Sequence, residues 1–186
     1  MMNTYETEKQ FIDISSVNFS GRILDVGGGG EGVISRKAGD IVVAIDRREE
    51  ELIETPDVGL KIIMDACNLK FLSNSFENIT AFYTLMYMNE QEVQLFLQEA
   101  YRVLKIGGLL WIWDITLPSH AAADIFVAQL DIKLSDELHI STGYGVAWNR
   151  EQTIDTVRKS CENIGFITEF SENINQSFSL RLQKYK

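Results

Sequence analysis

Short hydrophobic runs alternate with helical patterns through the first two thirds of the chain. The runs are rich in β-branched and aromatic residues, and most end at or near an aspartate, as expected for strands inside a parallel sheet. They lie at residues 23–26, 41–45, 60–64, 78–82 and 109–113. Between them, one helical pattern ends at Ala38, a second covers residues 48–54, and a third begins at Asn89. This alternation predicts parallel βαβ crossovers and an open sheet covered by helices on both faces.

One helical pattern precedes the last of these strands, and another lies at the N-terminus. Asn89, with Glu92 three residues later, forms an N-cap signature, and apolar residues then recur at helical spacing up to Leu104. We expect Gly107-Gly108 to end that helix. At the N-terminus, residues 5–17 place a few apolar side chains among polar ones, which predicts a short amphipathic helix or lid within residues 1–19.

The pattern changes after Pro118. Apolar positions there recur every second residue, which predicts a β-hairpin inserted at residues 117–148 with its turn at residues 135–137. An amphipathic helix over residues 151–163 follows, and two strands at 167–170 and 178–185 complete the chain. We therefore expect a single domain over residues 1–186.

A glycine-rich turn follows the first strand of the predicted sheet. Gly27, Gly29 and Gly32 fit G-x-G-x-x-G, and Asp46 lies 19 residues beyond Gly27, which alone suggests a dinucleotide site. Asp25, two residues before the turn, would repel a pyrophosphate resting there. S-adenosylmethionine instead brings a cationic ammonium and sulfonium, and its carboxylate can accept from free backbone N–H groups of the turn.

The ends of the next strands offer partners for adenosine. Asp46 can accept both ribose hydroxyls, and Asp65 can accept from the adenine amine while the Ala66 N–H meets a ring nitrogen. Arg47 is interpreted either as a cation–π partner of adenine or as half of a surface salt bridge. The predicted cofactor-binding residues are Asp25, Gly27, Gly28, Gly29, Asp46, Arg47, Asp65, Ala66 and Tyr83.

These residues resemble the signatures of a known family. Ile23-Leu24-Asp25-Val26-Gly27-Gly28-Gly29 resembles motif I of the class I S-adenosylmethionine-dependent methyltransferases, and Val43-Ala44-Ile45-Asp46 and Met64-Asp65-Ala66 are similar to the motifs that follow it. The residues from Phe76 to Leu85 and from Tyr101 to Gly108 extend the similarity, which covers about residues 20–116. The resemblance implies a Rossmann-like, doubly wound, seven-stranded sheet, mostly parallel with an antiparallel last strand.

Three departures from the family pattern stand out. Glu31 occupies a motif I position that is commonly glycine, and Ile106 replaces a usual proline before the glycine pair. No Asn-Pro-Pro-aromatic sequence follows the fourth strand, where Tyr83-Thr84-Leu85 stands instead. The methyltransferases that act on amino groups of nucleic acids or glutamine are therefore poor matches.

Composition narrows the chemical class of the methyl acceptor. The chain has 186 residues, with 17 Lys and Arg against 27 Asp and Glu, a net charge of −10 that disfavours nucleic acid. Its longest aliphatic-aromatic run, Leu109–Trp113, is too short to cross a membrane, and the N-terminus does not resemble a signal peptide. Cys67 and Cys161 lack metal-ligand or disulfide patterns, so we expect reduced thiols and no metal site. We expect a cytoplasmic protein that methylates a small molecule.

The sequence assigns no catalytic residue. Asp114, His120, Tyr83 and Tyr87 are candidate bases by position alone. Two other functions stay open: an NAD(P)-dependent oxidoreductase that uses the glycine turn, and a non-catalytic module that binds S-adenosylmethionine. The exposed edge of the hairpin at residues 117–148 is a candidate homodimer contact.

Overall fold

The structure is a computed structural model that describes residues 2–119 and 122–186. Its centre is a seven-stranded sheet in the order β10-β11-β7-β6-β3-β4-β5. The strands are β3 (Ile23–Val26), β4 (Val42–Asp46), β5 (Leu60–Ile63), β6 (Phe76–Phe82), β7 (Leu104–Ile115), β10 (Phe166–Ile174) and β11 (Ser177–Lys184). The first five are parallel to one another, and β11 is antiparallel to both of its neighbours. The predicted Rossmann-like sheet with an antiparallel last strand is confirmed.

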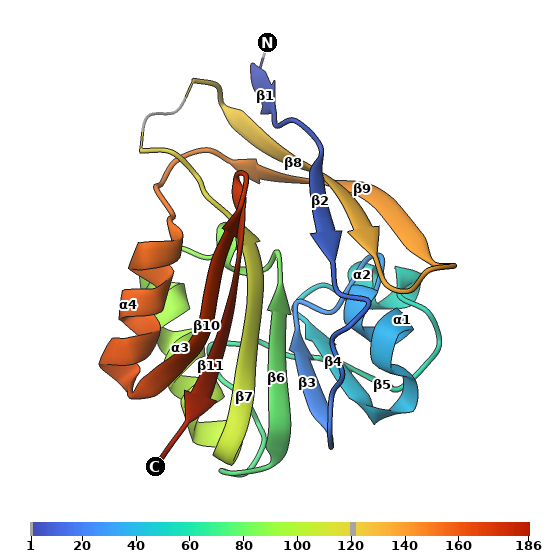
Figure 1. Ribbon diagram of the computed structural model, residues 1–186, viewed down its shortest axis with the longest axis vertical. Coiled ribbons are helices and arrows are strands. Elements are labelled where there is room, and N and C mark those ends of the chain that lie inside the picture. Colours follow the sequence, from blue (N-terminus) through green and yellow to red (C-terminus); the bar gives the residue numbers. More distant parts are fainter. Residues whose placement is uncertain (1, 120–121) are drawn as a thin grey trace.

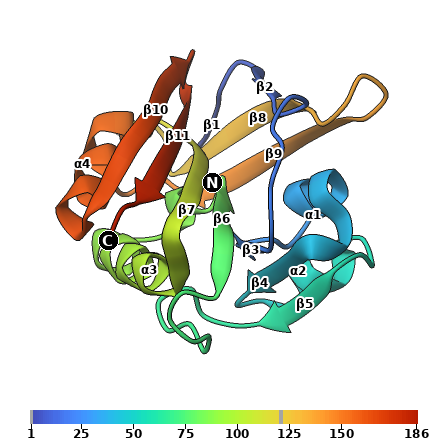
Figure 2. The ribbon, with the colours of Figure 1, turned by 60° about the horizontal axis from the view of Figure 1, so that its bottom comes forward.

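Helices cover both faces of this sheet (Figures 1 and 2). On one face, α3 (Glu90–Val103) and α4 (Ile154–Ile164) pack against the alternate strand residues that include Leu24 and Ile45. On the other, α1 (Val33–Ala38) and α2 (Glu49–Glu54) pack against the set that includes Ile23 and Ala44. Two short 3-10 helices, η1 (Gly39–Ile41) and η2 (Leu85–Tyr87), complete the helical elements of the described residues.

The helix predicted from Asn89 is present, with a different end. Asn89 accepts the N–H of Glu92 at 2.9 Å, and the Glu92 carboxylate accepts the N–H of Asn89, which completes a capping box. The helix stops at Val103, because Leu104 already pairs with Phe76 in the sheet. The expectation that the glycine pair at 107–108 ends the helix is wrong: both glycines lie inside β7.

A second, four-stranded sheet consists of β1 (Thr4–Glu6), β2 (Gln10–Asp13), β8 (Ile125–Lys133) and β9 (His139–Ala147). β8 and β9 form an antiparallel hairpin, and the N–H of Leu134 donates to the carbonyl of Leu138 at its turn. β1 and β2 run parallel to β8 along its other edge. The helix predicted over residues 5–17 is therefore wrong. Buried Gln10 and Ile12 alternate with exposed Phe11 and Asp13, a period of two that belongs to a strand.

The four-stranded sheet lies across the end of the large sheet toward which β6 and β7 point (Figure 1). Its buried side chains, among them Ile12, Phe126 and Ile132, share one hydrophobic cluster with Ile23 and Trp113 of the large sheet. The small sheet therefore covers the carboxyl ends of the parallel strands, where ligands of such folds bind. No helix within the described residues is long and apolar enough to cross a membrane.

Candidate functional site

A cavity of about 460 Å³ lies at the carboxyl ends of the parallel strands, next to β9. This volume is within the range of small-molecule sites. Its walls come from the glycine turn after β3, the segments after β4, β5 and β6, and the middle of β9. The lining residues are Val26, Gly27, Gly29, Gly30, Glu31, Ile45, Asp46, Arg47, Arg48, Glu51, Met64, Asp65, Ala66, Cys67, Phe82, Tyr83, Thr84, Tyr87, Met88, Tyr144 and Gly145.

Seven of the nine predicted cofactor residues line this cavity: Gly27, Gly29, Asp46, Arg47, Asp65, Ala66 and Tyr83. Asp25 and Gly28 do not border it. Strands that are adjacent in the sheet thus bring together residues that are up to 56 positions apart in the sequence, between Gly27 and Tyr83.

The glycine turn is close-packed. Gly27 has φ +69°, and a Cβ there would lie 2.6 Å from the Thr84 hydroxyl oxygen. A Cβ on Gly29 would lie 2.4 Å from the Cβ of Glu51. The N–H groups of Gly27 and Gly28 both donate to the carbonyl of Ile45, at 2.9 and 3.1 Å, so they are not free for a ligand. Only glycine fits this turn, which leaves its surface open to an incoming group.

Asp25 lies beneath the turn. Its carboxyl is fully buried and accepts a 2.7 Å hydrogen bond from Thr80 on β6. Burial raises the pKa of Asp25 from 3.8 to about 7, while the Thr80 bond opposes that shift. A Cβ on Gly28 would lie 2.6 Å from the other Asp25 oxygen. Asp25 and Gly28 therefore pack against each other. Because the Asp25 carboxyl is buried beneath the turn, it no longer supports the expectation that a pyrophosphate would be repelled there.

Asp46 ends β4 at the cavity wall. Its carboxylate accepts the N–H of Arg48 at 2.9 Å, which fixes the start of α2. Arg47 also lines the cavity, and its guanidinium forms a 3.0 Å ion pair with Glu92 of α3. Of the two interpretations of Arg47, the salt bridge is thus present. Arg48 in turn forms an ion pair with Glu51.

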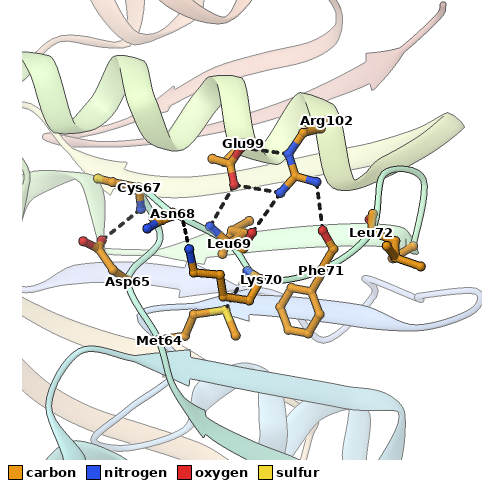
Figure 3. A network of polar contacts seen from close by, with 11 residues as sticks. Met64, Asp65, Cys67, Asn68, Leu69, Lys70, Phe71, Leu72, Glu99 and Arg102 are labelled. Carbon is orange, nitrogen blue, oxygen red and sulfur yellow. Dashed lines mark hydrogen bonds and ion pairs between the residues drawn. The ribbon is translucent and has the colours of Figure 1, made fainter.

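The segment after β5 is held in place by α3 (Figure 3). Asp65 accepts the N–H of Cys67 at 2.9 Å, which closes the turn that carries Ala66. Further along, the Leu69 N–H donates to Glu99 at 2.8 Å, and the Arg102 guanidinium donates to the carbonyls of Leu69 and Phe71.

Arg102 also makes a two-point contact with Glu99, both bonds at 2.8 Å. This partly exposed ion pair thus holds the Leu69 amide and the carbonyls of Leu69 and Phe71. The cavity wall at Asp65 and Ala66 is therefore rigidly placed relative to the helix.

The candidate bases occupy different positions. Tyr83 lines the cavity with φ +50°, but its hydroxyl is 2.5 Å from that of Ser177, and burial raises its pKa. Asp114 does not line the cavity: it is fully buried, and burial raises its pKa to about 6. His120 lies outside the described residues. Tyr87 lines the cavity, and its hydroxyl has no hydrogen-bond partner among the described residues.

Asp114 instead holds the loop after β6. Its carboxyl accepts the N–H groups of Leu85 and Met86, at 2.8 and 3.3 Å, and the side-chain amide of Gln152 at 2.7 Å. The Arg150 guanidinium donates to the carbonyl of Leu85. These contacts position the loop that presents Tyr87 to the cavity, so Asp114 is a positioning residue.

Glu31 and Tyr144 are two of the cavity residues that the sequence did not place in the site. Tyr144 on β9 donates to a carboxylate oxygen of Glu31 at 2.9 Å, and Thr142, two residues earlier on the same face, donates to the other oxygen. Glu31 was noticed only as a departure from glycine. The period of two in β9 places Thr142 and Tyr144 on one face, but only the docked hairpin brings that face to the glycine turn.

Fold and cavity together define a Rossmann-like α/β protein with a small-molecule pocket at the carboxyl edge of its sheet. Residues 24–112 match the family model described as a methyltransferase domain. The fold is that of the class I S-adenosylmethionine-dependent methyltransferases. A comparison with curated proteins gives no match.

Solved structures agree with this fold. A SAM-dependent methyltransferase from Methanosarcina mazei has a TM-score of 0.67 at 18% identity, over 91% of this chain and 94% of that one. A putative methyltransferase from Bacillus halodurans has a TM-score of 0.65 at 18% identity, over 93% and 96%. The [4+2]-cyclase SpnF has a TM-score of 0.66 at 15% identity, over 92% and 78%. The fold therefore carries more than one kind of chemistry.

Proposed function

We propose that the protein binds S-adenosylmethionine in this cavity and transfers its methyl group to a small-molecule acceptor. The observation that carries the proposal is the meeting of three features at one cavity: the glycine turn at Gly27 and Gly29, and the strand-end carboxylates Asp46 and Asp65. The methyltransferase-domain match over residues 24–112 supports the same cofactor.

The adenosine half fits the β4 and β5 side. In the proposal, Asp46 accepts the two ribose hydroxyls, Asp65 accepts from the adenine amine, and the Ala66 N–H donates to a ring nitrogen. Arg47 lies along the rim of the adenine site while it is anchored to Glu92.

The methionine half fits the open glycine turn and Tyr83. Since the N–H groups of Gly27 and Gly28 are used inside the turn, the carboxylate must take others. The N–H groups of Gly29 and Glu31 have no hydrogen-bond partner among the described residues, and both residues line the cavity. They are the donors we assign to the carboxylate.

The bound cofactor supplies a methyl group that its sulfonium already activates. The protein then has to align the acceptor with that methyl and exclude water. Asp114 positions the loop that carries Tyr87, and β9 covers the cavity with Tyr144 and Gly145. This role needs no covalent nucleophile, and a base matters only where the acceptor carries a proton that must leave.

One argument against a nicotinamide cofactor no longer holds. Buried Asp25 no longer excludes a pyrophosphate, so the methyltransferase-domain match is what favours S-adenosylmethionine. A non-catalytic binding module would share the cofactor site and differ only in the lack of turnover.

The organisation of the chain forms part of the proposal. A single domain over residues 1–186 is supported by the hydrophobic cluster that both sheets share. A homodimer through residues 117–148 is supported by the edge of β9 that pairs with no strand among the described residues. The cytoplasmic location rests on the sequence alone.

Calorimetric titrations with S-adenosylhomocysteine and with NAD test the proposal. We expect S-adenosylhomocysteine to bind and NAD not to bind. Asp46→Ala is expected to weaken the binding about 10- to 100-fold, since it removes hydrogen bonds to a charged acceptor worth about 1.5–3 kcal/mol. Asp57→Ala is the matched control, because Asp57 is fully exposed and lies outside the cavity.

Binding of NAD without S-adenosylhomocysteine would overturn the proposed function. Equal affinity of the wild type and Asp46→Ala for S-adenosylhomocysteine would overturn the ribose assignment alone. Product formation in an acceptor screen then separates an enzyme from a binding module.

A further inference from the structure

Part of the cavity is formed by elements other than those that carry Asp46 and Asp65. This part is lined by Glu31 from the glycine turn, Tyr83 and Tyr87 from the segment after β6, and Tyr144 from β9. Resting on the function proposed above, we propose that this part binds the methyl acceptor as a small cationic amine, with the ammonium group at the Glu31 carboxylate and against the tyrosine rings.

Charge is the first reason. Both oxygens of the Glu31 carboxylate accept from neutral hydroxyls, those of Thr142 and Tyr144, and the carboxylate has no ion-pair partner among the described residues. The nearby Arg36 binds the backbone carbonyl of Glu31 at 2.7 Å. A carboxylate that faces a cavity without a counter-charge favours a cationic ligand.

The two arginines that line the cavity are already paired with protein carboxylates. Arg47 forms an ion pair with Glu92, and Arg48 forms one with Glu51. These two guanidinium groups are thus engaged, and neither binds Glu31. An anionic acceptor would meet the Glu31 carboxylate without a free cation beside it, so the cavity disfavours carboxylate and phosphate substrates.

The tyrosine rings are the second reason. The centroids of the Tyr83 and Tyr144 rings are 5.7 Å apart, and their hydroxyls bind Ser177 and Glu31. Burial and the charge of Glu31 raise the pKa of Tyr144, so its phenol stays neutral. Tyr87 is 46% exposed and lines the same cavity. Neutral aromatic rings attract a cation to their faces.

Methyl transfer requires the neutral form of the amine nitrogen. The bound ammonium first loses one proton to water, and the freed nitrogen lone pair forms a bond to the methyl carbon. The bond between that carbon and sulfur breaks, and its electron pair stays on sulfur, which becomes a neutral thioether. The nitrogen takes the positive charge, so Glu31 faces a cation before and after the reaction and serves to hold the acceptor.

The test compares matched probes that differ in charge. The protein saturated with S-adenosylhomocysteine is titrated calorimetrically with 2-phenylethylamine, 2-phenylethanol and phenylacetate. We expect the amine to bind at least about tenfold more tightly than the alcohol and phenylacetate to bind weakest. With S-adenosylmethionine, mass spectrometry should detect N-methylated amine and no methylated alcohol.

Three variants locate the effect. Glu31→Gln should lower amine affinity about tenfold and leave alcohol affinity within about twofold. Tyr87→Leu, which keeps the apolar volume and removes the ring, should lower amine affinity by a few-fold. Glu50→Gln removes an equal charge from an exposed position on α2 and should change nothing. Thermal unfolding of each variant checks that its fold is intact.

Other outcomes separate this inference from the proposed function. If wild type does not bind S-adenosylhomocysteine, the proposed function fails and this inference fails with it. If the cofactor product binds but the amine binds no better than the alcohol, the inference alone is overturned. The inference is also overturned if Glu31→Gln weakens the binding of S-adenosylhomocysteine much more than that of 5′-methylthioadenosine. Because 5′-methylthioadenosine lacks the amino-acid group, this result would mean that Glu31 holds the ammonium of the cofactor.

Discussion

The two sheets that enclose the cavity contribute to it in different ways. The seven-stranded sheet contributes a glycine turn and carboxylates at the ends of parallel strands, which are fixed by the sheet ladder. The four-stranded sheet contributes Tyr144 and Gly145, which reach the cavity only because the hairpin docks on the large sheet. Under the proposed function, the first region holds the cofactor, and the two regions together form the acceptor site. Acceptor choice can therefore change through the second region while cofactor binding stays.

The two regions nevertheless share a core, which sets a limit to their independence. Phe126 of β8 is fully buried, with its ring centroid 5.5 Å from that of Tyr5 and 5.1 Å from that of Trp148. The same cluster includes Ile23 of the large sheet. Because one cluster joins both sheets, we expect them to unfold together.

The largest effect is expected from Phe126→Ala. Loss of this ring should lower the free energy of unfolding by about 3–5 kcal/mol, through lost burial and the cavity left behind. Urea unfolding, followed by tryptophan fluorescence and far-ultraviolet circular dichroism, should show a single transition at lower urea. Phe170→Ala is the control, because Phe170 is 45% exposed on β10 and should cost less than about 1 kcal/mol. Two separate transitions would show that the four-stranded sheet folds on its own.

The two regions differ in how far local sequence patterns predict them, for a physical reason. Asp46 and Asp65 follow hydrophobic runs, and parallel strands bring such ends to one edge, so local patterns were enough to place them. The N-terminal strands pair with β8, with Thr4 opposite Ile125, and no local pattern shows so distant a partner. The buried position of Asp25 was missed because it depends on Thr80, a residue of another strand.

The contact of Glu31 with the hairpin was also beyond the sequence. Its partners Thr142 and Tyr144 lie more than a hundred positions away, and they reach it only when the hairpin is docked. Long-range packing of this kind decides the acceptor side of the cavity, whereas the ladder of neighbouring strands decides the cofactor side.

Asp25, which is buried in the first region, contrasts with Glu31, which faces the cavity. Because burial raises the pKa of Asp25 from 3.8 to about 7, the folded protein holds a proton that the unfolded chain releases above about pH 4. Stability should therefore fall as the pH rises through the range from about 4 to about 7. Asp114, with a pKa of about 6, adds to the fall over the lower part of this range.

Asp25→Asn should remove most of the Asp25 share of this fall. Asparagine stays neutral and keeps an oxygen for the Thr80 hydroxyl, so between pH 5 and pH 8 the variant should lose about 1–3 kcal/mol less stability than the wild type. Urea unfolding across this pH range measures the difference, with exposed Asp57→Asn as the control. Parallel stability curves for wild type and Asp25→Asn would show that Asp25 is ionised in the folded protein.

The smallest effect is expected at the loop after β5, where a substitution tests how rigidly the first region must be held. Arg102→Lys keeps the charge but loses the planar group that bonds Glu99 and the carbonyls of Leu69 and Phe71 at once. We expect a loss of about 1–2 kcal/mol in the free energy of unfolding. Arg158→Lys is the control, because its ion pair with Asp155 is exposed and should contribute less than about 0.5 kcal/mol.

The same variant links loop rigidity to cofactor affinity. Leu69 and Phe71 belong to the loop that carries Asp65, so a looser loop should weaken S-adenosylhomocysteine binding by a few-fold, measured by calorimetry, with the same enthalpy sign as in the wild type. If affinity stays unchanged while stability falls, the turn closed by the Asp65–Cys67 bond holds the adenine side by itself, and α3 supports the fold only. If both fall together, preorganisation of the first region extends from the strand ends to the helix behind them.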